Sequence, residues 1–502
     1  MSAHPHPLVS KPDVLREIFG HLGDTPRSLA DSARACQAFF PHAVDVLWEK
    51  LDDPVPLLKT LGESLVEDKN EDGRGVYVLD GYISEEQWQR FHSYARRVRI
   101  LTVVEENLTI HPSVYSELTF RARRQPVFSA LVHLSWESVH PFGTHLLAFI
   151  SSSLHRVEII YGPPYSMRER PAMKDRTLGR ALCTLSSEAP FVYQLHLDAS
   201  IFHSESLYAI SHFTRLRELR IASAVSASEV VRCCGSLEEL VNLQLFNFTG
   251  AEVNDAPFVG GFDNLEELWV TGSSTTLAKL LRAVTSPRLR MAGICFTPEG
   301  GNWNDWRKCL ALLSSQFAGS LRQLGLRFHN NDESDLHLMD FIHPLLDIHG
   351  LREVELEVEH PPAELTDSDV HDLASAWRDI EKLTVELRSN SMPMSPSALS
   401  LVEFARYCPR LVCLEFNPLN VLLPLPPPSP SCPLPSLASL EDLSIPYHLI
   451  PDTNEEQIAR FLDSIFPNLD LRLCRYPGAV EEDHNSEFPA MSRLRAAWKS
   501  QS

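Results

Sequence analysis

A short apolar pattern recurs along most of the chain and constrains its fold more than any other feature. In each copy an apolar residue is followed by two variable residues, a second apolar residue, one variable residue and a third apolar residue. The step between copies is about 24 residues from position 216 to 289 and about 30 residues from 321 to 440. The copies are Val98/Leu101/Val103, Leu131/Leu134/Trp136, Leu154/Val157/Ile159, Val192/Leu195/Leu197, Leu216/Leu219/Ile221, Leu240/Leu243/Leu245, Leu265/Leu268/Val270, Leu289/Ala292/Ile294, Leu321/Leu324/Leu326, Leu351/Val354/Leu356, Ile380/Leu383/Val385, Leu411/Leu414/Phe416, Leu440/Leu443/Ile445 and a degenerate Phe466/Leu469/Leu471.

Each copy is typical of a short strand followed by a helix. The second and third apolar residues are two apart, so they point to the same face of a strand. Apolar residues at helical spacing lie in the gaps between copies. Strands and helices that alternate at a fixed period build a solenoid with a parallel sheet along its inner face. The clearest helical gaps are 306–317, 336–348, 370–377, 399–407 and 458–466.

The repeat length is similar to that of leucine-rich repeats, whose usual range is about 20–29 residues. We therefore predict an α/β fold in which residues 81–476 form a curved leucine-rich-repeat solenoid with a parallel inner sheet. A doubly wound open sheet is the alternative, but about fourteen strands exceed the ordinary size of such sheets. The spacing is irregular before residue 216, so the boundaries of the first repeats stay open.

Three short helical patterns precede the repeats. In the first, Leu15, Ile18 and Leu22 share one helical face behind Pro12, which suits a first helical turn. Three such helices bury little among themselves, so we expect an exposed apolar surface, which usually marks a partner site. The second helix carries Leu29, Ala33 and Cys36, and the third carries Val44, Leu47, Trp48 and Leu51.

The order and spacing of these residues resemble the F-box motif. Two departures, Lys11 in place of a leucine and Ala35 in place of a valine, reduce the apolar face and leave open whether the motif functions. The resemblance implies binding to a Skp-type adaptor and, through it, to a cullin. The alternative is a helical cap that seals the repeat array. The adaptor-binding residues that the resemblance implies are Pro12, Leu15, Ile18, Leu22, Leu29, Cys36 and Trp48.

A second stretch carries a resemblance to a narrower family. Ser84 and Gln87 form a capping-box pattern, and Trp88, Phe91 and Ala95 then lie on one helical face before Val98. Together with the motif at residues 1–52, this stretch resembles a set of fungal F-box-like proteins with C-terminal leucine-rich repeats. We expect residues 53–80, which include an acidic, glycine-containing stretch, to be a linker. The spacing of Leu57, Leu61 and Leu65 is compatible with one helix within it.

Two further segments interrupt or follow the repeats. Residues 422–436 are rich in proline, which favours polyproline II and cannot continue a helix or a central strand. We interpret them as an exposed insertion, with docking to a proline-recognition module as the alternative. Residues 477–502 form an acidic tail.

Charge and motif content narrow the function classes. The net charge of −21 disfavours nucleic-acid and anionic-membrane partners, because both require basic side chains. None of the 10 cysteines has zinc-site spacing, and no phosphate loop, dinucleotide fingerprint or hydrolase motif occurs. We predict no metal, no cofactor, no catalytic residues and a cytoplasmic or nuclear location, since neither a signal peptide nor a membrane span is visible.

The variable positions of the predicted strands face outward and would contact a partner. Arg220 and Trp269 fall in one row across the strands, and Phe246 falls in the next. Aromatic and arginine side chains dominate interface energetics, so we predict that Arg220, Phe246 and Trp269 bind a protein target. A frame shifted by one residue would instead bury both aromatic residues. Glutamates alternate along 353–359 and predict a solvated acidic face.

Together these features predict a non-catalytic substrate-recognition subunit of an SCF-type cullin-RING ubiquitin ligase. The F-box would bind the Skp adaptor and the repeats would bind a protein target of unknown identity. The alternative is a leucine-rich-repeat scaffold or inhibitor without a role in ubiquitination.

Overall fold

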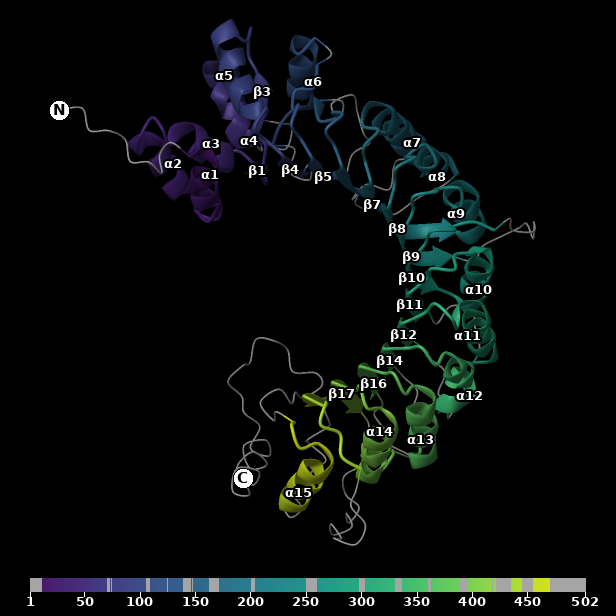
Figure 1. Cartoon of the computed structure of the whole chain (residues 1–502). Coiled ribbons are helices and arrows are strands. Elements are labelled where there is room, and N and C mark those ends of the chain that lie inside the picture. The colour runs from purple at the N-terminus through teal and green to yellow at the C-terminus, as the bar shows by residue number, and fades with distance from the viewer. Residues whose placement is uncertain are drawn as a thin grey trace, which may run out of the picture. The chain divides into compact units, whose positions relative to one another are not determined.

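The computed structural model places alternating helices and strands along most of the chain (Figure 1). It forms two compact units, residues 1–225 with 236–240 and residues 226–235 with 241–502. The structure describes residues 11–69, 73, 75–104, 109–123, 125–138, 146, 148–161, 171–199, 204–249, 260–297, 303–329, 336–359, 363–388, 395–417, 419–420, 435–444 and 455–469. The Pro-rich insertion, apart from its last two residues, and the acidic tail lie outside them.

The first unit begins with three short helices, α1 (Pro12–Gly20), α2 (Pro26–Ala35) and α3 (Phe40–Leu47). Leu15, Phe19, Leu29 and Ala43 form the core of this three-helix cluster. The buried stripe of α1 is therefore Leu15 with Phe19, whereas Ile18 is exposed. Our expectation that Leu15 and Ile18 lie together on one partner-facing side is wrong, because the burial boundary passes between them.

The segment expected to be a linker is folded wherever it is described. It contains α4 (Val55–Leu58), the 3-10 helix η2 (Lys59–Ser64) and the antiparallel strands β2 (Leu65–Lys69) and β3 (Gly75–Leu79). Leu57 and Leu61 are buried as the helical pattern suggested, but Leu65 begins β2. The linker prediction is wrong because buried leucines at 57, 58 and 61 anchor a segment whose acidic end alone resembles a solvated chain.

The parallel sheet of the first unit starts earlier than predicted. Strand β1 (Lys50–Leu51) pairs in parallel with β4, with Leu51 opposite Leu101. Leu51 therefore belongs to a strand and not to the third helix. The strands follow the order β1, β4 (Ile100–Val104), β5 (His133–Ser138), β6 (Arg156–Tyr161), β7 (Gln194–Ala199) and β8 (Glu218–Ser226), and the helices are α5 (Glu85–Ala95), α6 (Pro112–Arg121), α7 (Pro171–Glu188) and α8 (Ser204–Ile210).

The second unit repeats the same strand-and-helix alternation, with strands along one face and helices along the other (Figure 1). Its main strands, in spatial order, are β9 (Asn242–Thr249), β10 (Glu267–Gly272), β11 (Met291–Phe296), β12 (Gln323–His329), β14 (Glu353–Glu359), β16 (Lys382–Arg388), β17 (Cys413–Asn417) and β18 (Asp442–Ser444). Its helices are α9 (Ala227–Cys234), α10 (Ser274–Ala283), α11 (Trp303–Phe317), α12 (Leu338–Ile342), η4 (His343–Asp347), α13 (Asp367–Ala376), η5 (Ala398–Ser400), α14 (Leu401–Tyr407) and α15 (Glu455–Ile465). Short strands β13 (Leu336–His337) and β15 (Ala363–Glu364) pair separately.

The repeat pattern accounts for the core. In the twelve copies from Val98/Leu101/Val103 to Leu411/Leu414/Phe416, every apolar residue is at most 2% exposed. Equivalent positions are paired in register, as Leu268 with Ala292 and Val270 with Ile294 show. The predicted strands and the parallel sheet are thus confirmed, and so is the capping box at Ser84 and Gln87. Of the last two copies, Ile445 and Leu471 lie outside the described residues.

No helix in the described part of the chain is long and apolar enough to cross a membrane.

Candidate functional site

The outward face of the second unit's sheet carries aligned rows of side chains. The first row comes from the variable position between the second and third apolar residues of each copy, and the second row comes from the position after the third apolar residue, so the pleat directs both rows away from the apolar positions. The row used below is Gln244, Trp269, Gly293, Gly325, Glu355, Thr384 and Glu415, and the next is Thr271, Cys295, Arg327, Glu357, Glu386 and Asn417.

Trp269 stands out in the first row. Its side chain is 38% exposed, while its neighbours Leu268 and Val270 are buried. The alternative, in which a shift of one residue would bury Trp269, is therefore wrong for β10. Phe246 on β9 is half-buried in the same unit, and Arg220 is exposed on β8 of the first unit. Their role in target binding stays a prediction.

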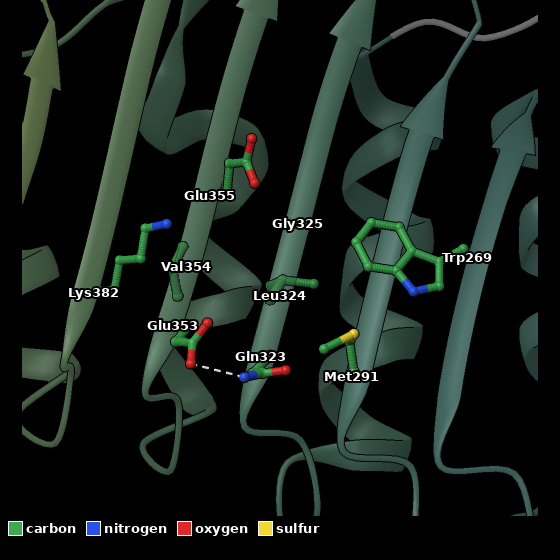
Figure 2. Close-up of a pocket in the computed structure, with 9 residues that line it drawn as sticks. All are labelled: Trp269, Met291, Gln323, Leu324, Gly325, Glu353, Val354, Glu355 and Lys382. Atoms are coloured by element: carbon green, nitrogen blue, oxygen red, sulfur yellow. Dashed lines mark hydrogen bonds between the residues drawn. The ribbon is translucent and has the colours of Figure 1, made fainter. Parts of the chain in front are cut away.

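Two adjoining hollows open beside Trp269. The first, of about 330 Å³, includes Phe246, Thr271, Cys295, Arg327 and Glu357 in its lining. The second, of about 90 Å³, includes Met291, Gln323, Glu353 and Lys382 (Figure 2). Both include Trp269, Gly325 and Glu355. We refer to the two hollows together as the Trp269 hollow, because the indole of Trp269 lines both of them.

Two glycines explain why the sheet is hollowed at this point. A Cβ on Gly293 would lie 2.0 Å from the Cε3 atom of Trp269, so the indole rests directly on the backbone of the next strand. A Cβ on Gly325 would meet no atom closer than 3.9 Å, so it would extend into open space. Strands are about 4.8 Å apart. The indole covers Gly293, so the room for a guest between the indole and Glu355 lies at Gly325.

The wall opposite Trp269 is formed largely by glutamates, as Figure 2 shows for Glu353 and Glu355. Gln323 Nε2 donates a hydrogen bond of 2.8 Å to Glu353 Oε1. Arg327 pairs with Glu357, which is only 5% exposed. The prediction of a solvated acidic face is thus wrong for Glu357. Glu355 is exposed and forms no hydrogen bond or ion pair with the residues that the structure describes.

The acidic character continues across the next strands. Burial raises the pKa of Glu415, and the carboxylates of Glu386, Asp442 and Glu355 raise it further, against the opposing effect of Lys382. Glu415 on β17 is therefore repelled by the carboxylates of Glu355 on β14, Glu386 on β16 and Asp442 on β18. A bound cation would relieve that repulsion.

A stacked aromatic cluster supports the hollow from the core side. The rings of Phe296 on β11 and Phe328 on β12 are stacked with centroids 4.9 Å apart, and Trp306 of α11 lies 5.2 Å from Phe296. Large buried rings fix the spacing of β11 and β12, the two strands whose glycines form the floor. The hollow is thus part of a packed region and not a loop feature.

The first unit has a polar group on its own outward face that sequence reasoning missed. Ser135 Oγ donates to Glu158 Oε2 at 3.0 Å, and His196 Nε2 lies 2.8 Å from Glu218 Oε1. Burial lowers the pKa of His133 beside them, against the opposing effect of Glu158. These pairs could not be predicted, because polar residues alternate with apolar residues in all of these strands and their spacing does not indicate which of them meet. No group of three or more His, Cys, Asp or Glu residues in the described ranges could hold a metal ion.

The seven predicted adaptor-binding residues divide by exposure. Pro12 and Ile18 are exposed, and Leu22, Cys36 and Trp48 are half-buried, whereas Leu15 and Leu29 are buried in the three-helix cluster. Trp48 stacks on Tyr94 of α5 with centroids 4.8 Å apart. Asp45 of α3 pairs with Arg97. The end of α3 is therefore joined to the first helix of the repeats.

Two alanine substitutions test the contact between the Trp269 indole and the backbone of Gly293. Glycine in a strand destabilises by roughly 0.5–1 kcal/mol relative to alanine, so Gly325→Ala is expected to raise the free energy of unfolding by about that amount. Gly293→Ala is expected to give little or no gain, because its methyl displaces the indole. Urea denaturation measures both, and equal gains would contradict the contact between Trp269 and Gly293.

No protein-family model matches the chain, and no curated protein sequence matches it. Among solved structures, the crystal structure of a TLR13–ssRNA13 complex is similar, with a TM-score of 0.32 and 11% identity over 70% of this chain. That alignment covers 60% of the TLR13 chain, so it spans less than two thirds of that protein. LegL7 from Legionella pneumophila, described as leucine-rich repeat-containing, is similar with a TM-score of 0.29 and 13% identity over 73% of this chain and 98% of LegL7.

The repeat period, the parallel register and the buried apolar positions show an α/β fold of repeated strand and helix units along a parallel sheet.

Proposed function

We propose that the chain is the substrate-recognition subunit of an SCF-type cullin-RING ubiquitin ligase. The three-helix cluster binds a Skp-type adaptor, and through it the cullin, while the repeats hold a protein target. Transfer of ubiquitin belongs to the other subunits. This chain contributes by placing the target near them, which raises the effective concentration of the reacting groups.

The single observation that carries the adaptor role is the surface of the three-helix cluster. Its helices enclose a small core of their own, yet they leave Ile18 47% exposed and Phe40 45% exposed. Apolar side chains left in solvent on a small helical unit favour an interface. Together with the ordered resemblance to the F-box motif, this supports an adaptor surface that includes Pro12 and Ile18.

The observation that supports a target-binding role is the Trp269 hollow. An exposed indole over a glycine floor offers an anchor site of the kind that dominates interface energetics. Phe246 borders the same hollow. Arg220 is exposed on a strand of the first unit, and its part in target binding is a separate proposal for that unit.

A second function is favoured by the burial of Leu15 and Leu29. Side chains that make the core of the cluster are also what a helical cap needs, and the departures at Lys11 and Ala35 weaken the F-box pattern. Under this alternative the chain is a leucine-rich-repeat scaffold or inhibitor. Co-purification with a Skp-type adaptor separates the two functions.

The adaptor surface is tested by Ile18→Asp. A charge in place of an exposed isoleucine leaves the cluster folded but removes an apolar contact worth roughly 1.5–3 kcal/mol when buried by a partner. We expect the affinity for a purified Skp-type adaptor to fall roughly tenfold or more, measured by isothermal titration calorimetry on the full chain.

Phe120→Asp is the matched control, because Phe120 is an equally apolar, exposed side chain on α6, outside the three-helix cluster. Its adaptor affinity should equal that of the wild type. Equal binding by Ile18→Asp and the wild type, or no binding by the wild type at all, would contradict the proposed function and favour the scaffold.

A further inference from the structure

The Trp269 hollow has features that select a particular kind of guest. Trp269 lies against Gly293 on one side and is open to solvent elsewhere, so part of its π-system is available. The face of an indole attracts cations, with an energy of roughly 0.5–1 kcal/mol at exposed sites and more where water is excluded. Gly325 leaves the space beside the indole empty of side chains.

The charge around the hollow complements a cation as well. On the outward face of β12 to β18 the described carboxylates outnumber the described cations, and Arg327 is already paired with Glu357. Glu353 accepts a hydrogen bond from Gln323, whereas Glu355 at the rim faces solvent. The carboxylates are Glu353, Glu355, Glu357, Glu386, Glu415 and Asp442, and the cations are Arg327 and Lys382.

A planar guanidinium fits both features better than an ammonium. It stacks on aromatic faces and donates two parallel hydrogen bonds to a carboxylate. Trp269 and Glu355 lie on opposite sides of the two glycine strands, so one side chain over Gly325 lies between them. An acidic segment or a nucleic acid would face repulsion from this surface.

We propose that the Trp269 hollow binds an arginine side chain of a basic segment in the target protein. The guanidinium lies beside Gly325 and above the sheet, stacks on the solvent-facing side of the Trp269 indole and pairs with Glu355. Following basic residues lie over Glu386, Glu415 and Asp442, the outward carboxylates of β16, β17 and β18. The proposal rests on the proposed function in taking this face as the target surface, and it adds the chemical class of the target.

The probe is fluorescein-labelled hexa-arginine, titrated into the full chain at physiological salt by fluorescence anisotropy. Hexa-citrulline, which is nearly isosteric and uncharged, is the matched peptide. Trp269→Leu keeps an apolar side chain and removes the π face, and Gly325→Leu fills the hollow. Asp372→Asn on α13 removes one exposed negative charge outside the hollow and controls for net charge, as the partner of Glu355→Gln.

We expect hexa-arginine to bind the wild type and Asp372→Asn equally, and hexa-citrulline to bind neither. Trp269→Leu, Gly325→Leu and Glu355→Gln should each weaken hexa-arginine binding about tenfold, with circular dichroism spectra that show each variant to be folded. Binding of equal strength by all variants would show general attraction to the net charge of −21 and overturn the proposal. Absence of binding to the wild type, or equal binding of hexa-citrulline, would overturn it too.

Adaptor binding of the same variants keeps the two proposals distinct. Loss of peptide selectivity with intact adaptor binding overturns the ligand class and leaves the receptor function standing. Selective peptide binding by a chain that binds no adaptor overturns the receptor function and supports a scaffold that recognises basic segments.

Discussion

Replacing Leu326 with alanine is expected to lower the free energy of unfolding by about 2–5 kcal/mol. Leu326 is fully buried on β12, where it is in register with Ile294 on β11 and Leu356 on β14. Removing its isopropyl group leaves a cavity that neighbouring strands cannot close without shifting the whole sheet. Because each repeat is stabilised by its neighbours, the loss should lower the stability of several repeats together.

Glu355→Ala, on the outward face of the adjacent strand, is the matched control. Its side chain is exposed, and surface substitutions usually change stability by less than about 0.5 kcal/mol. Urea denaturation followed by circular dichroism compares the two variants. A larger loss for Glu355→Ala than for Leu326→Ala would contradict the assignment of inward and outward positions.

The repeats were predictable because one physical rule sets both their sequence and their structure. A strand with one buried face needs apolar residues two apart, and stacking at fixed period keeps the same residues buried in each copy. The row that contains Trp269, Gly293 and Gly325 follows from that period alone, because the register pairs Trp269 with Gly293 and Gly293 with Gly325.

The hollow could not be predicted from the same rule. Its volume depends on the absence of side chains at Gly293 and Gly325 and on the direction in which the Trp269 indole turns. Periodicity says which side a residue faces but not where its ring comes to rest. The burial of Glu357 was missed for a similar reason, because its ion pair with Arg327 is a contact between strands about thirty residues apart in sequence.

The folded segment after α3 was missed because its signals are short. Strand β1 has two residues, so no alternation is visible, and Leu51 fits a helical spacing as well as a strand.

In α1, Leu15 and Ile18 are about 60° apart around the helix axis, since each residue turns the helix by about 100°. A face of that width contains both a core position and a surface position, and only packing decides between them.

Leu15→Asp tests this division between core and surface. Leu15 is 4% exposed and packs in the same core as Phe19 and Leu29. A buried carboxylate without a partner costs several kcal/mol, which three short helices with so small a core cannot offset. We expect the cluster to unfold and hydrogen exchange in residues 11–48 to become fast, whereas Ile18→Asp leaves it protected.

How far unfolding spreads along the chain in Leu15→Asp shows whether the three-helix cluster is a separate module. The repeats of the first unit have a core of their own, in which Leu101, Leu134 and Val157 are buried in register. Amides in β5 and β6 should therefore stay protected in Leu15→Asp, while Trp48 loses its stacking on Tyr94 and amides in α5 exchange faster. Loss of protection throughout β4 to β8 would instead mean that the three helices are an integral cap of the array, as the scaffold alternative requires.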